Sequence, residues 1–491
     1  MKARPLRTFG RNEDGFVLVF AAVCIPALLG LLGLAVDGTR LMTFDTQLAA
    51  TVDAAALAAA SQLDWTEGAI ERAVTAGNAL TNGVTFARRN RASPRLSFRF
   101  AATLADLRAD PAYTLSETEG AQAVFVEATT GEYTLTESLL QVLGTPIQRR
   151  AVAEAQYYAC DVTPMVLCHA DPERFAASAR PGRQYLLRMD GNIANGSVVP
   201  LDRPDDLASR TTLRNLASDA PAFCYGQGVS LRRNIAPRDF DDALNIRFDR
   251  YFNGIAAVAS DLATFPPAPS VIQGRHLQAC SSPPSSGDVN PPYHLPRDAA
   301  YRTVRPAAAY DQGLGDWAVT AAYGGLGEIS VARAIDEYIL WNHADKDSSF
   351  QASLREAPTR YDIYLRELGL TPATESQPVV TQGNRLVGKT MPTGGPLTGP
   401  FAFVRESPIP VCYPGVRPAT DARRRILYLS VADCRDFTTN PSPARLSRHV
   451  AKVFLTEPAS GGSVLVELVG MLTPRKDDGK LRPVVQLVET H

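Results

Sequence analysis

The sequence predicts an α+β fold: a single N-terminal transmembrane helix that continues into an Ala-rich helix, followed by mixed α+β regions with a strand-rich C-terminus. Three observations lead to this class. Residues 16–36 form an uncharged apolar run, and alanine dominates residues 41–63. The last segment has the β-branched runs that are typical of strands, at 425–432, 448–455, 463–472 and 482–489.

The composition excludes several classes of protein. The chain has 491 residues, which predicts about two or three domains. Hydrophobic residues make up 45% and charged residues 21%, as in ordinary folded proteins. The net charge of −1 provides no global basic field, so we expect no nucleic-acid partner. A polymerase, a histone-like protein and a coiled-coil rod all fit poorly.

The apolar run at 16–36 is long enough to cross a membrane. At 1.5 Å per residue it spans about 31 Å, against a hydrocarbon core of roughly 30 Å. The segment before it, 1–15, is basic, and its positive residues are Lys2, Arg4, Arg7 and Arg11. Basic residues remain in the cytoplasm, so we expect a cytoplasmic N-terminus, with the bulk of the chain across the membrane.

Three alternatives to an uncleaved anchor fit the sequence less well. A cleaved signal peptide has a shorter apolar region of about 7–15 residues, and no clear Ala-x-Ala site follows this run. A buried core helix of this length would normally have a polar face. A prepilin-type leader cut between Gly15 and Phe16 usually has Glu at the fifth position of the mature chain, but that position here is Phe20. We therefore predict an uncleaved anchor, bent at Pro26.

Residues 37–66 predict an Ala-rich helix that continues out of the membrane. Within its 41–63 stretch, apolar residues recur at helical spacings of three, four and seven. Small side chains permit another helix to approach closely. This helix either packs on its own domain or packs on a partner, including a second copy of the chain, and the sequence favours neither interpretation.

The N-terminal pattern resembles the N-terminal module of TadG-like pilus-assembly proteins. The features that carry the resemblance are an ordered set, and they are Asp14-Gly15, the span ending at 33–37, Arg40, 47–50 and 53–60. The module covers about 60 residues, roughly an eighth of the chain. Shorter stretches that resemble later regions of such proteins lie at 149–153, 160–164, 360–364 and 453–458.

The resemblance implies a component of a tight-adherence (Flp-type) pilus system, anchored in the bacterial inner membrane with its bulk in the periplasm. Such a component is a structural or interaction protein, not an enzyme. Its implied partners are other pilus-assembly proteins or pilin-like subunits. Some members carry a von Willebrand type A domain with an Asp-x-Ser-x-Ser metal motif, which this sequence lacks, so no metal site is expected. The alternatives are a membrane-tethered, hydrolase-like periplasmic enzyme and a secreted surface adhesin.

The expected organisation of the chain follows from these patterns and from shifts in composition. A Pro/Ser/Gly-rich stretch indicates a linker or a long loop. The expected regions are a cytoplasmic basic segment 1–15, an anchor 16–36, the Ala-rich helix 37–66, a periplasmic α+β region 67–264, the linker 265–306 and a C-terminal α+β region 307–491.

Cysteine usage agrees with an oxidising compartment. Cys24 lies inside the apolar run, and six more cysteines fall on the predicted periplasmic side. An even number there favours disulfides, with 15 connectivities allowed. Local pairing of Cys160 with Cys168 and of Cys412 with Cys434 is the interpretation that we favour. The full set of candidate disulfide cysteines is Cys160, Cys168, Cys224, Cys280, Cys412 and Cys434.

The searches for catalytic and ligand-binding residues predict none, and no cofactor. Residues 383–390 match Gly-x4-Gly-Lys-Thr, but the prolines and glycines that follow prevent the helix that phosphate binding needs. Residues 423–425, three arginines before a strand, are interpreted as a solvated edge. The acidic pairs 205–206 and 241–242 are interpreted as residues at helix starts. The six histidines are interpreted as surface or capping residues: His169, His276, His294, His343, His449 and His491.

Overall fold

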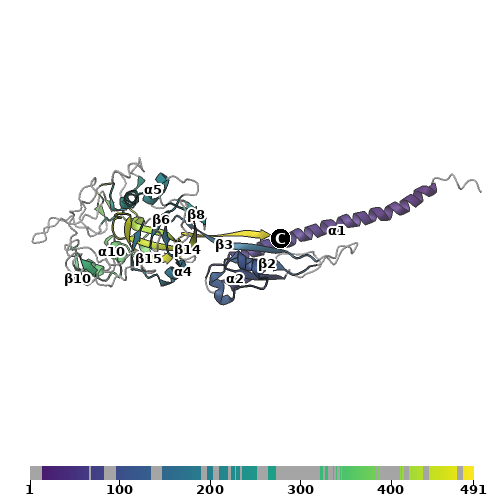
Figure 1. Ribbon diagram of the computed structural model, residues 1–491, viewed down its shortest axis with the longest axis horizontal. Coiled ribbons are helices and arrows are strands. Elements are labelled where there is room, and N and C mark those ends of the chain that lie inside the picture. The colour runs from purple at the N-terminus through teal and green to yellow at the C-terminus, as the bar shows by residue number, and fades with distance from the viewer. Residues whose placement is uncertain are drawn as a thin grey trace, which may run out of the picture. The chain divides into compact units, whose positions relative to one another are not determined.

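The computed structural model divides the chain into two compact units (Figure 1). Unit 1 comprises Met1–Gln156 with Pro483–His491, and unit 2 comprises Tyr157–Arg482. Unit 2 is therefore inserted into unit 1 in the sequence. The residues that the structure describes are 14–65, 68–81, 95–133, 146–189, 196–202, 209–218, 223–226, 228–232, 235–251, 264–271, 321–323, 327–329, 336, 339, 343, 346–379, 381–382, 385–386, 410, 412–413, 420–434, 442–472 and 479–490.

Unit 1 begins with one long helix, α1 (Asp14–Ala60), which continues through Pro26. Alanine and leucine, the strongest helix formers, supply much of its length. A turn at Ser61–Gln62 follows, and the short helix α2 (Ala69–Thr81) packs back against α1. The prediction of one N-terminal apolar helix that continues into an Ala-rich helix is confirmed.

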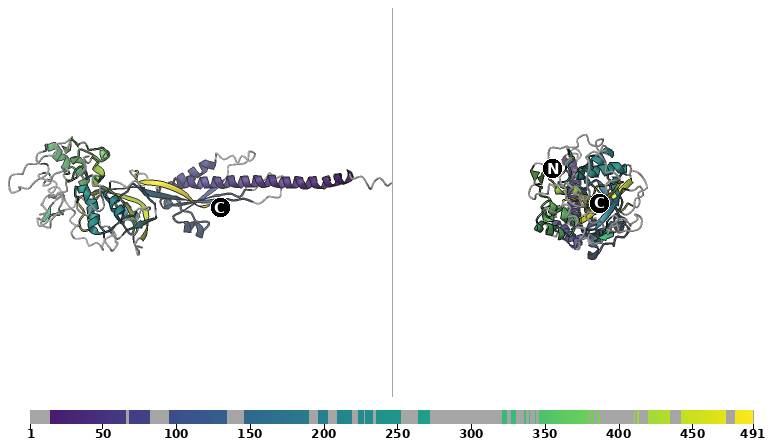
Figure 2. Two further views of the ribbon diagram at one scale, coloured as in Figure 1. Left: turned by 90° about the horizontal axis from the view of Figure 1, so that it is seen from above. Right: turned by 90° about the vertical axis from the view of Figure 1, so that its left-hand side faces the viewer.

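The sheet of unit 1 is antiparallel where its register is defined, and its strands follow the order β1-β2-β3-β16. The strands are β1 (Leu96–Ala101), β2 (Phe125–Thr130), β3 (Arg150–Cys160) and β16 (Leu481–Thr490), with α3 (Leu104–Ala109) and the 3-10 turn η2 (Glu117–Gln122) between β1 and β2. Figure 2 shows α1 running alongside these strands. The fourth strand, β16, comes from beyond unit 2 in the sequence.

The other face of this sheet carries a ladder of ion pairs. Glu127 of β2 is 4% exposed and accepts from Arg99 of β1 on one side, with Nε–Oε1 2.7 Å. On the other side Arg150 of β3 approaches it, with Nε–Oε2 2.7 Å. Arg150 also reaches Glu489 of β16 at 3.1 Å. A buried carboxylate between two guanidinium groups is compensated, which is the condition for burying charge.

Unit 2 is built on a seven-stranded sheet of order β5-β15-β14-β13-β4-β6, with β8 paired to β14. Only the β13–β4 pair is parallel among the registers described. The strands are β4 (Met165–Cys168), β5 (Gln184–Arg188), β6 (Val198–Pro200), β8 (Gly228–Leu231), β13 (Ile426–Ala432), β14 (Ser442–Leu455) and β15 (Ser463–Leu472). The two-residue strand β7 (Cys224–Tyr225) pairs with the end of β3.

Short helices accompany this sheet and complete its core. They are α4 (Pro172–Ser178), α5 (Ser209–Ala217), α6 (Pro237–Asn245), α9 (Ser348–Arg355) and α10 (Arg360–Glu367). The N-caps Asp171, Asp347 and Thr359 each accept from a backbone N–H in the first turn. The remaining elements are η3 (Ile246–Phe248), η6 (Pro372–Thr374), η7 (Ala422–Arg425), β9 (Ala321–Tyr323), β10 (Gly327–Ile329), β11 (Thr381–Gln382) and β12 (Arg385–Leu386).

The α+β prediction with a strand-rich C-terminus is confirmed, because β13 to β16 lie where the four β-branched runs occur. The predicted segment boundaries stay predictions. Of the predicted linker 265–306, the structure describes residues 265–271, and the rest of the linker lies outside the described residues.

Candidate functional site: the N-terminal helix and the groups that hold it

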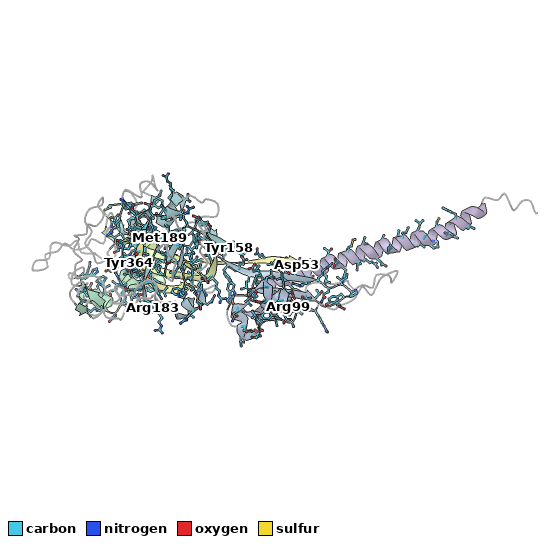
Figure 3. The ribbon with its side chains drawn as sticks, viewed as in Figure 1. Asp53, Arg99, Tyr158, Arg183, Met189 and Tyr364 are labelled. Atoms are coloured by element: carbon cyan, nitrogen blue, oxygen red, sulfur yellow. A yellow bond between two sulfur atoms is a disulfide. The ribbon has the colours of Figure 1, made fainter. Side chains whose placement is uncertain are left out.

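The N-terminal half of α1 exposes its apolar side chains. Between Val19 and Leu34 the large apolar residues are 47–68% exposed, and Met42 is 72% exposed. Elsewhere in the described part of the chain, the exposed large hydrophobic residues are Leu80 and Val488. Figure 3 shows these helix side chains pointing outward. The helix is long and apolar enough to cross a membrane, by length and composition.

The C-terminal half of α1 is covered by unit 1 itself. Its apolar positions are 0–1% exposed, and they are Leu48, Val52, Ala55, Ala56, Ala59 and Ala60, followed by Leu63 after the helix. Except for Leu48 and Ala55, they share a core with alanines of β2 and β3, such as Ala128 and Ala151. Packing on its own domain, one of the two interpretations of 41–63, therefore holds for 48–63. A partner can reach this face only at its N-terminal end.

A buried glycine permits part of this close packing. Gly77 of α2 has no side chain where a Cβ would lie 2.5 Å from the Phe98 ring and 3.2 Å from the carbonyl oxygen of Ala55. A methyl group cannot occupy that space unless the Phe98 ring moves. The contact explains why α2 carries glycine inside a helix, where glycine costs about 1 kcal/mol relative to alanine.

An ion pair joins α1 to the sheet just after the exposed half. Arg149, directly before β3, donates two hydrogen bonds to the Asp45 carboxylate. Its Nε lies 2.7 Å from Oδ1, and its Nη2 lies 2.6 Å from Oδ2. Both side chains are about one-third exposed. The stretch 149–153 thus binds the helix through Arg149 and the sheet ladder through Arg150. The bidentate geometry fixes how the helix is rotated relative to the strands.

In unit 2 the arginine run before β13 is buried, so its interpretation as a solvated edge is wrong for Arg424 and Arg425. The Arg425 guanidinium lies 4.6–4.9 Å from three ring centroids, those of Phe248, Tyr364 and Phe454. It donates to the carbonyl oxygens of Leu455 and Thr456 at 2.8–3.1 Å. Aromatic faces and carbonyl oxygens replace water around this cation.

The other two arginines of the run differ from one another. Arg424 is 3% exposed and donates to the carbonyl oxygen of Ala217 at 2.6 Å, at the end of α5, where a cation suits the helix dipole. Arg423 is exposed and pairs with Asp421 at 2.9 Å. Only Arg423 fits the expected solvated position.

A buried carboxylate from β15 accepts hydrogen bonds at the N-terminus of α10. Glu467 of β15 is 0% exposed and accepts from the backbone N–H groups of Arg360 at 3.0 Å and Tyr361 at 2.9 Å. Burial raises the pKa of Glu467 to about 7, against the lowering effect of those hydrogen bonds. The stretches 360–364 and 453–458, far apart in sequence, meet around this group and Arg425.

The acidic pair 241–242 does not lie at a helix start, so that interpretation is wrong. α6 begins at Pro237, which places both residues in its second turn, and both are buried. Asp241 accepts from the Gly462 N–H at 3.1 Å, and burial raises its pKa to about 6. One turn on, Asn245 exchanges two hydrogen bonds with the Ala459 backbone. These side chains hold the β14–β15 connection. The pair 205–206 lies outside the described residues.

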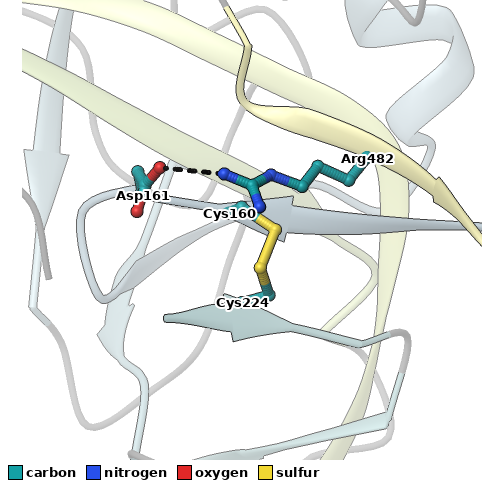
Figure 4. The surroundings of a disulfide bond; sticks show 4 residues. All are labelled: Cys160, Asp161, Cys224 and Arg482. Atoms are coloured by element: carbon teal, nitrogen blue, oxygen red, sulfur yellow. Dashed lines mark ion pairs between the residues drawn. A yellow bond between two sulfur atoms is a disulfide. The ribbon is translucent and has the colours of Figure 1, made fainter. Parts of the chain in front are cut away.

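Both predicted local disulfides are wrong, because cysteines pair with neighbours in a sheet. Cys160 of β3 bonds to Cys224, its register partner on β7 (Figure 4). Cys168 of β4 bonds to Cys434, two residues past Ala432, its register partner on the parallel strand β13. Cys412 is also disulfide-bonded, whereas Cys24 is free. Cys280 lies outside the described residues. Figure 4 also shows Asp161 and Arg482, 3.7 Å apart.

The remaining candidates for chemistry show no assembled site. Of the 383–390 motif, only Arg385 and Leu386 are described. His169, His343 and His449 are buried, so the surface interpretation is wrong for all three. His343 lies 2.8 Å from Glu367, and His449 lies 2.8 Å from Glu173. The other three histidines lie outside the described residues. Among the described residues, no three His, Cys, Asp or Glu side chains are grouped to hold a metal ion.

The described structure thus has one apolar helix that meets the length and composition of a membrane anchor, with its C-terminal half built into a folded unit. The comparisons with known proteins agree with this class. Residues 15–62 match the TadE/G-like Flp pilus-assembly family. The match covers the exposed and buried halves of α1 together, and it agrees with the resemblance found in the sequence. Comparison with curated proteins and with solved structures gives no match.

Proposed function

We propose that this protein is an inner-membrane-anchored component of Tad/Flp-type pilus assembly that acts through interaction and not through catalysis. The observation that carries the proposal is the division of α1, because the segment matched to the pilus-assembly family has one exposed apolar half and one half buried in unit 1. In this proposal the exposed half crosses the bilayer. The buried half then fixes unit 1 directly beside the membrane.

The basic segment before α1 supports a cytoplasmic N-terminus and a periplasmic bulk. The disulfides of unit 2 support the same side, since disulfides persist in oxidising compartments. The partners in this proposal are other pilus-assembly proteins or pilin-like subunits. They would contact surfaces of the two units that lie outside the membrane.

The test is deletion of the gene with complementation in trans, scored by electron microscopy of surface pili. The intact chain is expected to restore pili. A variant with Leu29→Arg and Leu32→Arg places two charges among exposed apolar positions, at about 2.5–3.5 kcal/mol each for insertion, and is expected to leave the membrane fraction and to lose pili.

The matched control is Glu117→Arg with Thr118→Arg, which adds arginine at two exposed positions of η2. It is expected to behave as the intact chain. Normal piliation in the deletion strain would contradict the assembly role. Recovery of a shortened protein from the culture medium would contradict the anchored state and favour a released adhesin.

A further inference from the structure

The sheet of unit 1 ends in a strand whose outer edge is open. β16 is last in the strand order, and no strand in the described part of the chain pairs with its outer side. Two contacts show that it lies antiparallel to β3. The Cys160 N–H donates to the Lys480 carbonyl oxygen at 2.7 Å, and further along the strands the Gln486 side chain donates to Glu154 at 3.2 Å. The other side of β16 presents a row of backbone N–H and C=O groups.

The alternation of hydrogen bonds along the strands indicates which groups form this row. In β3 the N–H of Ala155 donates toward β2, whereas the N–H of Cys160 donates toward β16. Odd-numbered residues of β3 therefore face β2, and even-numbered residues face β16. Because the Lys480 carbonyl faces β3, the same alternation places the backbone groups of Val485 and Leu487 on the outer edge.

The opposite edge of the same sheet is closed by the chain itself. Phe100 of β1 accepts from the Leu115 N–H at 2.8 Å, and its own N–H donates to the Thr114 hydroxyl at 3.0 Å. In unit 2 the end strand β6 is occupied in a similar way, because the Pro200 carbonyl oxygen accepts from the Arg232 N–H at 2.9 Å. Of these three edges, that of β16 is the one left open among the described residues.

The open edge also lacks the features that normally prevent strands from pairing. Natural edge strands are short, or carry lysine, proline or inward-pointing charges. The stretch 484–488 reads Val-Val-Gln-Leu-Val, without charge or proline. Val488 is 37% exposed, and Val485 and Leu487 pack against the alanine core but are only half-buried. An added strand would cover this border of the core.

We propose that the edge 484–488 binds an extended segment of a pilin-like subunit, which adds to the sheet of unit 1 as the next strand, antiparallel to β16. This inference rests on the proposed function and deepens it by naming the surface that receives the subunit. The segment has apolar side chains at alternate positions, beside Val485 and Leu487 on the side of α1. Its polar side chains lie beside Gln486 on the opposite face.

The anchor favours a subunit over a second copy of this chain. α1 runs along the strands, since Asp45 meets Arg149 at the start of β3 and Ala59 shares a core with Ala155 further along it (Figure 2). Two copies of β16 paired antiparallel are related by a two-fold rotation that points their α1 helices in opposite directions. Such helices cannot enter one bilayer from the same side. Pairing with β1 of another copy is blocked at Leu115.

The direction of β16 agrees with a partner anchored in the same bilayer. β16 ends beside the start of β3, where Glu489 pairs with Arg150 at 3.1 Å, and this is the end of unit 1 at which Asp45 begins the buried half of α1. A strand antiparallel to β16 therefore runs away from the exposed half of α1. A chain that leaves the bilayer after an N-terminal anchor runs in that direction, so it presents its strand without reversing.

The test is residue-resolved amide exchange in the full chain in nanodiscs, with and without the purified pilin-like subunit of the same pilus system. The subunit is expected to slow exchange of the Val485 and Leu487 amides at least tenfold, and to change that of Gln486, which faces β3, much less. Gln486→Lys with Val488→Lys adds charge at two exposed positions and should abolish the slowing. Ser97→Lys, exposed on β1 with its closed edge, is the control and should preserve it.

Protection of 150–155 in each variant verifies that the sheet stays folded. Exchange at 485 and 487 that the subunit leaves unchanged would overturn the assignment of the edge. Full restoration of pili by the doubly substituted chain, in a deletion strain that lacks them, would also overturn it and leave the assembly role intact. Slow exchange at 485 and 487 in the chain alone, lost on dilution, would show a second copy on the edge and overturn the choice of a subunit.

Discussion

The cores of the two units differ in the size of the side chains that fill them and in the charge that they enclose. Unit 1 packs small residues of α1 against small residues of the sheet, such as Ala56 and Ala59 against Ala151 and Ala153. Unit 2 packs larger aliphatic and aromatic side chains, and it encloses Arg425 among three aromatic rings. The first core depends on how closely two backbones approach. The second depends on how completely buried charges are compensated.

This difference predicts different weaknesses. A core of alanines has little volume to lose but tolerates no added volume, because nothing between helix and sheet can move aside. A core with buried charge tolerates modest changes of shape but not the loss of a partner. Four experiments separate the two behaviours, and each compares local stability by hydrogen exchange with peptides assigned to one unit or the other.

The largest effect is expected for Arg425→Ala in unit 2. The substitution leaves a cavity between three rings and removes the donors that bind the carbonyl oxygens of Leu455 and Thr456. Leaving a buried carbonyl oxygen without its donor costs about 1–3 kcal/mol, and the cavity left by the side chain adds to that cost. Peptides of unit 2 should lose protection while those of unit 1 retain it. Arg423→Ala, at the exposed member of the run, is the control and should change neither unit.

A pH dependence of similar size is expected in unit 2 from Glu467. Its folded pKa of about 7 exceeds the ordinary value of 4.5, so the folded state binds more protons than the unfolded state between these values. Stability should therefore fall as pH rises from about 4.5 to 7, by on the order of 3 kcal/mol.

Glu467→Gln, which cannot ionise, should remove most of that slope, whereas Glu117→Gln at an exposed position should retain it. Asp241, with its pKa raised to about 6, contributes in the same direction and should leave a smaller residual slope. An unchanged slope in the Glu467→Gln chain would contradict the assignment.

Enlarging the alanine core should give an intermediate effect in unit 1. Ala59→Leu adds three carbons at a position that is 0% exposed, and overpacking of this kind costs about 1–3 kcal/mol. The control is Ala50→Leu, on the exposed side of the same helix, with the same added volume and the same change in helix propensity. Equal stability of the two variants would show that unit 1 can adjust, and the contrast between the cores would fail.

The smallest effect is expected for Asp45→Asn. The pair with Arg149 is about one-third exposed on both sides, and such pairs contribute about 0.2–1 kcal/mol. The loss should appear in peptides near Tyr133 and the start of β3, and it should shrink at high salt. Asn78→Ala on α2 removes a polar side chain elsewhere in unit 1, and it should not share this salt dependence.

Local pattern was enough to predict the long helix, the position of the four late strands and the α+β class. These features depend on runs of residues that are contiguous in the sequence, such as 16–36 and 463–472. The two interpretations of the Ala-rich helix could not be separated in the same way. Its partner surface comes from β2 and β3, about 70 to 100 residues later, and nothing in the helix itself identifies that surface.

The disulfides and buried arginines show a second limit. Cys168 pairs across 266 residues because β4 and β13 are parallel neighbours, and a parallel neighbour leaves no local signal. The run 423–425 contains three identical residues with two buried and one exposed. Whether each arginine is buried depends on the direction in which its side chain points at the start of β13. Three identical residues in a row do not indicate those directions.

Strand β16 has a consequence for the order of biosynthesis. Unit 1 obtains the fourth strand of its sheet from residues 481–490, after the whole of unit 2. The ribosome therefore finishes most of unit 2 before it makes the strand that completes the sheet of unit 1. During that interval the edge of β3 is an open template for other strands. A chain that ends before residue 481 therefore leaves the sheet of unit 1 one strand short, with the β3 edge unpaired along most of its length.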